Sequence, residues 1–317
     1  MAKTLTVIPR FLVATVRDEI VGSLPLFQVS SFIRGRRLLA APVCRNLPIL
    51  ADDANTARKL VQSSIGLARA TGCNTVEIRS GSPFPALPYF EKRYEFVNYS
   101  IDLNNGLDEV WSRFSTTSVK QRIRKAKREA IQVREIAGGD LSAYRSFHRL
   151  AIATRKKQGA PPLPMEFYSC LADLADQTNR SRLFLAERKG RILAAALVLI
   201  HNEIAHLFDA VSVTDKIELR HRPNHAVLWS AIKSAFNLGC RTFDLGPNHK
   251  LNQGLCNYKA HWGADAHEVT HYFIHIKGKK IRSAEIQAPT YKIAKNFLKN
   301  VPLSLYPFTW PLALEAY

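Results

Sequence analysis

The chain has 317 residues, of which 46% are hydrophobic and 22% charged, and a formal net charge of +19 at pH 7. This length allows two ordinary domains with a substantial core, and the composition excludes an intrinsically disordered protein. The positive charge indicates anionic partners, whether nucleic acid, phosphorylated substrates or an anionic membrane face, and does not choose among them.

Cysteine usage and hydropathy indicate a cytoplasmic protein. The N-terminal segment is interrupted by Pro9, Arg10 and Arg17, which makes it a poor signal peptide. The longest apolar run, residues 192–200, is too short to span a membrane. The cysteines are odd in number and form no Cys-x-x-Cys pair, which favours reduced thiols and gives no metal-binding pattern. They are Cys44, Cys73, Cys170, Cys240 and Cys256.

The first half of the sequence alternates predicted strands and helices. Strands are expected at about 20–33, 37–41, 74–79 and 95–102, and helices at about 54–71, 106–115 and 118–130. In the last helix, six of the nine residues from Lys120 to Arg128 are basic, Arg122 and Lys125 among them. A solvated helix face explains such a run, but a phosphate-contacting helix is the alternative. The preceding Ser-Thr-Thr-Ser, residues 115–118, could cap the helix and leave its N-terminus open to an anion.

The second half begins with two predicted helices, at about 141–158 and 165–178, the first carrying an apolar stripe at helical spacing. Three strands follow at 183–187, 192–200 and 204–210, the last two joined by a short turn. A helix over 224–238 leads to a strand at 240–245, a Gly/Asn-rich loop at 246–254 and a strand around Val269. The tail from Pro289 mixes aromatic, basic and proline residues, and we expect it to pack on the first half.

The segment His267–His275 contains His-Glu-x-x-His, the signature of zinc metalloproteases. That motif binds zinc only on a helix, where the two histidines share one face. Here β-branched and aromatic residues alternate, which predicts a strand. Histidines four residues apart in a strand lie ~13 Å apart. We therefore expect strand histidines that face a groove or solvent, and no metal site.

One internal similarity organises the chain. The segments 67–80 and 235–247 both end a helix at glycine and continue with Cys-x-Thr and a short apolar strand. An offset of 167 residues separates Cys73 from Cys240 and also Glu77 from Asp244. A repeated helix–glycine–strand unit predicts two similar α/β halves. We place the first at 1–138, with the tail 288–317 packed on it, and the second at 139–287.

Three segments carry a resemblance to a known family: Leu-Arg-His-Arg-Pro-Asn-His (219–225), Phe-Asp-Leu-Gly (243–246) and Tyr-Lys-Ala-His-Trp-Gly (258–263). With Gly22–Leu26 and Arg155–Pro161, their order and spacing resemble those of the FemAB-like proteins, over roughly residues 15–312. The resemblance implies a tandem GNAT fold, each half a mixed sheet flanked by helices, and acyl transfer to an amine. It also implies aminoacyl-tRNA or acyl-CoA as the donor, both of which suit a basic protein.

Two residues are the catalytic candidates. Lys259 matches the family's lysine in Tyr-Lys-x-x-Trp-Gly, which implies contact with the acyl carbonyl or a carrier phosphate; without the resemblance it would be an ordinary surface lysine. Asp244 ends a predicted strand, where it would orient or deprotonate the amine, or else cap the next turn. Trp262 either supports the loop or packs in the core.

Four further residues are candidates for donor binding. Asn224, at the start of a predicted helix, would bind the carrier or serve as the N-cap. Arg220 and Arg222 flank the same helix start and could bind phosphate, and Arg155 lies in a family-like segment. Acetyltransferases hold the CoA pyrophosphate with a glycine-rich turn before a helix, but residues 220–225 contain no glycine, and Pro223 removes one N–H donor. This favours a donor other than CoA.

Three functions stay open at this point. The first is aminoacyl transfer from tRNA to an anionic, phosphorylated or lipid-linked precursor of the cell envelope. The second is acyl-CoA-dependent N-acyl transfer to a small amine, and the third is a non-catalytic protein that binds nucleic acid or a membrane surface. All three predict no tightly bound cofactor, no structural metal and a cytoplasmic location, with peripheral contact at the inner membrane face as an extension.

Overall fold

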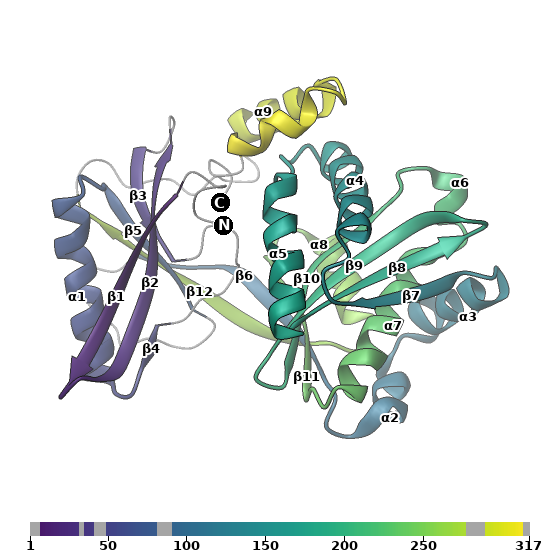
Figure 1. Ribbon diagram of the computed structural model, residues 1–317, viewed down its shortest axis with the longest axis horizontal. Coiled ribbons are helices and arrows are strands. Elements are labelled where there is room, and N and C mark those ends of the chain that lie inside the picture. The colour runs from purple at the N-terminus through teal and green to yellow at the C-terminus, as the bar shows by residue number, and fades with distance from the viewer. Residues whose placement is uncertain (1–6, 32–34, 41–48, 81–90, 277–288, 313–317) are drawn as a thin grey trace.

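The computed structural model describes residues 7–31, 35–40, 49–80, 91–276 and 289–312, and Figure 1 shows their arrangement. The N-terminal part contains four strands, one helix and two further strands: β1 (Ile8–Val16), β2 (Glu19–Ser31), β3 (Gly35–Leu39), β4 (Leu50–Ala51), α1 (Ala54–Ala70), β5 (Thr75–Ser80) and β6 (Glu91–Asp102). Three helical elements and a strand follow: α2 (Gly106–Arg113), the π-helical turn η1 (Thr116–Lys120), α3 (Gln121–Arg128) and β7 (Gln132–Ala137).

The remaining elements form the second part of the fold. They are α4 (Leu141–Gln158), α5 (Met165–Thr178), β8 (Ser181–Arg188), β9 (Arg191–His201), β10 (Ile204–Ser212), α6 (Lys216–Leu219), α7 (Pro223–Asn237), β11 (Thr242–His249), α8 (Gln253–Ala260), β12 (Asp265–His275), α9 (Pro289–Asn300) and the 3₁₀ segment η2 (Tyr306–Leu312). In the described residues, no helix is long and apolar enough to cross a membrane.

The described strands form one mixed, 12-stranded sheet in the order β1-β2-β3-β5-β12-β6-β11-β10-β9-β8-β7, with β4 beside β2. Helices α4 and α5 cover one face of β8–β10, and α7 covers the other (Figure 1). In β9, Ala195 and Leu197 pack with α4 and α5, while the alternate residues Ala194 and Ala196 pack with α7. A strand covered on both faces needs an unbroken apolar run, which is the run that the sequence shows here.

The repeated unit predicted from the sequence corresponds to two parallel strand pairs. Strand β5 runs parallel to β3 after α1, and β11 runs parallel to β10 after α7. Gly72 and Gly239 end these helices with φ of +66° and +79°, a conformation that costs glycine little. The predicted fold class, two GNAT-like halves of mixed sheet and helices, is confirmed. The boundaries at 138 and 287 stay a prediction, because β12 inserts between β5 and β6 in one continuous sheet.

Several elements differ from the sequence prediction. Strands β1 and β7 were not expected, and each exposes most of one face. The predicted loop at 246–254 is wrong in part: β11 extends to His249, because it pairs with β6 through Phe96, and α8 begins at Gln253. Residues 246–254 are rich in Gly, Pro and Asn, which favour loops, so pairing with β6 and packing decide their conformation.

The His-Glu-x-x-His segment is confirmed as a strand, β12. His267 is exposed and lies 3.0 Å from the Ser100 hydroxyl, whereas the buried His271 ring stacks on Phe96. The two histidines therefore have separate surroundings. Within the described ranges, no three His, Cys, Asp or Glu side chains are grouped so that they could hold a metal ion.

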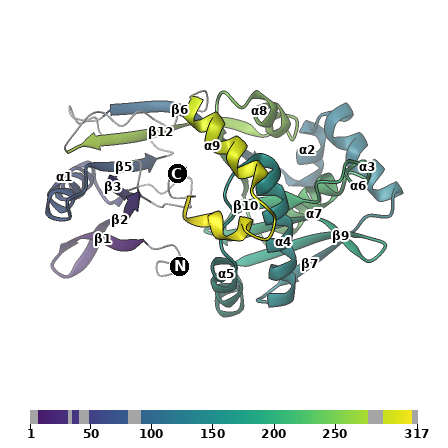
Figure 2. The same cartoon turned by 90° about the horizontal axis from the view of Figure 1, so that it is seen from above.

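The described part of the tail lies beside α4 (Figure 2), not against the first half as expected. The Lys156 ammonium donates to the carbonyls of Lys299 and Val301 at the end of α9. The buried Tyr306 hydroxyl donates to the Ala160 carbonyl at 2.5 Å. The exposed carbonyls at the end of α9 attract the lysine of α4, which the composition of the tail alone does not reveal.

Candidate active site

Strands β10 and β11 separate at a defined point in the middle of the sheet. They pair in parallel only from Ile204–His206 to Thr242–Asp244. Beyond this point β10 has an irregularity between Leu207 and Asp209, while β11 continues along β6 with a shift between Asp244 and Gly246. His206 and Asp244 therefore face each other where the two strands diverge.

The Asp244 carboxylate is held by three donors. It accepts hydrogen bonds from His206 Nδ1 at 2.9 Å, from Asn98 Nδ2 at 2.9 Å and from the Gly246 N–H at 2.8 Å. Burial raises the pKa of Asp244, but these hydrogen bonds outweigh it and hold the pKa below its ordinary value. Asp244 is therefore an ionised carboxylate at neutral pH, in a position to orient the imidazole.

The His206 side chain is 45% exposed, although one edge of its ring is fixed. An ionised carboxylate only accepts, so Nδ1 carries the proton in this bond. The opposite nitrogen, Nε2, is then an unprotonated acceptor in the neutral ring. Sequence reasoning missed His206 and Asn98, because neither lies near Asp244 in the chain; the only available signal was the place of His206 in a strand of the same half.

Lys259 lies in the last turn of α8 and is only 5% exposed. Its Nζ donates to the Gly246 carbonyl at 2.6 Å and lies 5.7 Å from the centre of the Tyr99 ring. Gly246 has a φ of +74°, so this position favours glycine. Gly246 donates its N–H to Asp244, and its carbonyl oxygen accepts from Lys259. The two catalytic candidates are therefore linked through one residue.

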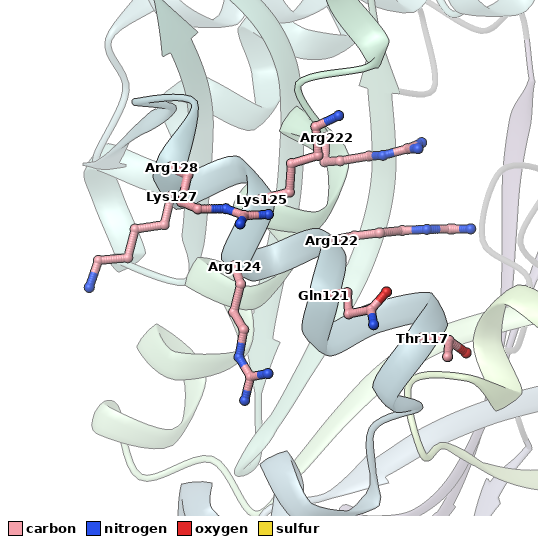
Figure 3. Close-up of a pocket in the computed structure, with 8 residues that line it drawn as sticks. All are labelled: Thr117, Gln121, Arg122, Arg124, Lys125, Lys127, Arg128 and Arg222. Atoms are coloured by element: carbon pink, nitrogen blue, oxygen red, sulfur yellow. The ribbon is translucent and has the colours of Figure 1, made fainter.

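A basic pocket lies between α3 and the start of α7, with a volume of about 1010 Å³ (Figure 3). Arg122 and Arg222 extend in the same direction in this view. The described lining residues include no carboxylate. Six of them are basic, namely Arg122, Arg124, Lys125, Lys127, Arg128 and Arg222, and the other two are Thr117 and Gln121. The structure therefore brings the predicted donor-binding residues Arg122, Lys125 and Arg222 into one pocket.

The two ends of this pocket are set by local backbone features. The Ser115 hydroxyl accepts from the Ser118 N–H at 3.3 Å, which confirms the predicted cap, although the first turn is π-helical. Helix α7 begins at Pro223, and Arg222 occupies the N-cap with a φ of +64°. Asn224 is therefore the second helical residue, so the interpretation of Asn224 as the N-cap is wrong; Pro223 fits the first position and fixes the start.

His225 lies beside the positively charged pocket, and its pKa is lowered there. Its side chain is buried, and burial together with the charges of Arg122 and Arg222 lowers its pKa to about 4. The ring is therefore neutral at physiological pH. It stacks on Trp262 with centroids 5.7 Å apart, and Trp262 lies three residues after Lys259. One aromatic cluster thus connects the basic pocket to the helix end that carries Lys259.

Comparison with known proteins identifies the domain. Residues 114–260, which include the basic pocket and Lys259, match the family model described as acetyltransferase (GNAT) domain. The chain therefore contains a GNAT-type domain, and it is an acyltransferase. No curated protein matches the sequence.

Solved structures share the fold of this acyltransferase at low sequence identity. FemX is 14% identical with a TM-score of 0.67, over 93% of this chain and 92% of that one. The C-terminal domain of a putative lysylphosphatidylglycerol synthetase from Agrobacterium fabrum is 13% identical with a TM-score of 0.56, over 80% and 81%. A tandem GNAT protein from the clavulanic acid biosynthesis pathway is 12% identical with a TM-score of 0.52, over 86% and 85%.

The remaining predicted residues of the acyltransferase lie elsewhere. Arg155, in α4, pairs with Asp209 of β10 and donates to Gln158 at 2.8 Å. Arg220 is exposed after α6 and is not among the lining residues of the pocket. Trp262 is fully buried, with Phe114 at 5.1 Å, which favours packing in the core over contact with a substrate.

Proposed function

We propose that this acyltransferase moves an aminoacyl or acyl group from a phosphate-bearing carrier to the amine of an anionic acceptor related to the cell envelope. The observation that carries the proposal is the basic pocket beside the start of α7. Six cationic side chains around one cavity would repel each other unless an anion occupied it. The donor phosphates supply that charge.

The start of α7 favours aminoacyl-tRNA as the donor. A pyrophosphate cradle uses several backbone N–H groups at a glycine-rich helix start. Here the chain passes from Arg222 to Pro223, which has no N–H, and no glycine lies in residues 220–225. Recognition would then depend on long cationic side chains spread along α3, which suits a polyphosphate backbone. Acyl-CoA is the second candidate, favoured by the match to the GNAT domain.

The divergence of β10 and β11 supplies a base for the transfer. The acceptor amine loses a proton as its nitrogen attacks the carbonyl carbon, and we assign that proton to His206 Nε2. Asp244 keeps the proton of the imidazole on Nδ1 and stabilises the imidazolium. The new C–N bond forms, the C–O bond of an ester or the C–S bond of a thioester breaks, and the carrier leaves with a proton.

Lys259 acts on Asp244 through the backbone of Gly246. Its ammonium holds the Gly246 carbonyl, while the Gly246 N–H holds Asp244. We therefore assign it a positioning role beside Asp244, with its positive charge favouring the oxyanion that develops on the acyl carbonyl. This role requires Lys259 to remain buried and bonded, as it is here, rather than free in solvent.

The proposed acceptor class rests on the fold neighbours and on charge. Two fold neighbours are FemX and the C-terminal domain of a putative lysylphosphatidylglycerol synthetase. The product in the second name, lysylphosphatidylglycerol, is an aminoacylated lipid, so lipid-linked envelope components are the first acceptor class to test here. A chain with a net charge of +19 attracts such phosphorylated or lipid-linked acceptors over several ångströms of solvent.

The decisive experiment compares donors with matched arginine variants. The full chain is titrated with acetyl-CoA and with a mixed aminoacyl-tRNA pool at near-physiological salt, as wild type, Arg122→Gln and Arg222→Gln. Arg220→Gln is the control, because Arg220 is exposed near the same helix but lies outside the pocket. We expect each pocket variant to weaken donor binding about tenfold and the control to leave it unchanged.

Each outcome separates the candidates. A preference for charged over uncharged tRNA, lost in the pocket variants, supports aminoacyl transfer. Saturable binding of acetyl-CoA with the same dependence on Arg122 and Arg222 selects the second candidate. Equal binding by wild type, pocket variants and control would show that the basic pocket is not the donor site.

A further inference from the structure

The tail segment formed by α9 and η2 has one packed face and one apolar face in solvent. Leu298 and Tyr306 are buried against the rest of the protein, at 6% and 0% exposure. Six large apolar residues of the same segment are exposed: Ile293 at 69%, Phe297 at 64%, Leu303 at 59%, Leu305 at 56%, Phe308 at 76% and Leu312 at 44%. Single exposed apolar residues are ordinary, but six within twenty residues of one segment, referred to below as the patch, indicate an interaction site.

The packed face holds this patch in place. Lys156 of α4 donates to the carbonyls of Lys299 and Val301, and its ammonium lies 5.7 Å from the centre of the Tyr306 ring. The Tyr306 hydroxyl bonds to the Ala160 carbonyl just after α4. The exposed residues are therefore carried by a segment bonded at both its helix and its 3₁₀ turn. Figure 1 shows this segment at the outer edge of the molecule, above α4.

The charge of the segment indicates what covers it. Residues 289–312 contain no aspartate or glutamate and three lysines, Lys292, Lys295 and Lys299. Lys157, at the adjoining end of α4, is exposed. Exposed aromatic and aliphatic residues between lysines are typical of helices that lie in the interface of an anionic bilayer. A second copy of this chain is disfavoured, because it would bring two patches of like charge together.

We infer that α9–η2 is a membrane-surface anchor that inserts its exposed apolar residues into the interface of an anionic bilayer, with its lysines at the headgroups. The inference does not depend on the donor or on the transfer reaction. It assigns the membrane contact to one segment, whereas the net charge alone would spread it over the whole surface. An acceptor embedded in a membrane would then meet the enzyme at a fixed orientation.

The test is co-sedimentation of the full chain with vesicles of phosphatidylcholine alone and of phosphatidylcholine mixed with phosphatidylglycerol. The test variant is Phe297→Ser with Phe308→Ser. The matched control is Ile20→Ser with Ile217→Ser, since these side chains are similarly exposed, at 71% and 67%, on other parts of the protein. All four changes are at exposed positions, and thermal unfolding checks that both variants fold.

We expect wild type and control to bind the mixed vesicles, and the test variant to bind on the order of tenfold more weakly or not at all. Binding to phosphatidylcholine alone should be weaker than to the mixture in each case. Equal binding by test variant and control would overturn the inference, as would no binding by wild type. A wild-type dimer that becomes a monomer only in the test variant would assign the patch to self-association and overturn it as well.

Discussion

The buried His225 predicts a specific loss of stability on acidification. Its pKa is about 4 in the folded protein, against 6.5 as its ordinary value, because burial and then the charges of Arg122 and Arg222 oppose protonation. Above pH 6.5 both states are neutral. Between pH 6.5 and about pH 4, His225 is protonated in the unfolded chain but stays neutral in the folded protein. The free energy of unfolding therefore falls across this window and then levels off. The shift corresponds to a loss of about 3 kcal/mol between pH 7 and pH 4.

The assay is urea unfolding at a series of pH values for wild type and His225→Phe. Phenylalanine keeps a ring against Trp262 and cannot titrate. Other groups also destabilise a basic protein in acid, but they act on both chains, so only the difference between the two curves reports on His225. We expect that difference to change by about 3 kcal/mol in favour of the variant as the pH falls. Parallel curves would refute the assignment of His225 as a neutral, buried ring beside two arginines.

Three further results are expected. His206→Ala and Asp244→Asn should each lower single-turnover rates by about 10²-fold or more with little change in donor affinity, and a rate within twofold of wild type would remove the proposed base. Lys259→Met should lower the free energy of unfolding by about 1–3 kcal/mol in urea titrations, because the Gly246 carbonyl loses its donor; no change would contradict the buried hydrogen bond. Gly263→Ala should destabilise by at least about 1 kcal/mol, because φ is +64° and the new Cβ would lie 2.7 Å from Arg113 Cβ; an unchanged melting temperature would argue against this close approach.

Local signals were sufficient for most helices. The predicted helix at 141–158 has the bounds of α4, because the Asp140 carboxylate accepts from the N–H groups of Ser142 and Ala143 and Gly159 ends it with a left-handed conformation. The helix at 165–178 likewise matches α5. Caps and apolar periodicity depend on residues within one or two turns, so a sequence contains the whole of this information.

Only part of the candidate site could be predicted from the sequence. Lys259 and Asp244 were named from a family resemblance, and their shared contact with Gly246 became visible only in the structure. Arg122 and Arg222 were each proposed to bind the donor, but nothing in a sequence places residues 100 positions apart in one pocket. Arg155 was named with them and instead pairs with Asp209, because α4 packs against β10.

The sequence by itself determined the α/β class, the repeated helix–glycine–strand unit, the strand character of 265–275 and the basic helix. Each of these follows from periodicity, glycine placement or charge over short stretches. Only the tertiary structure decided that His206 and Asn98 bind Asp244, since those residues are 38 and 146 positions from it. Their meeting requires β10, β11 and β6 to be neighbours in the sheet, and strand neighbours are set by packing over the whole chain rather than by any local pattern.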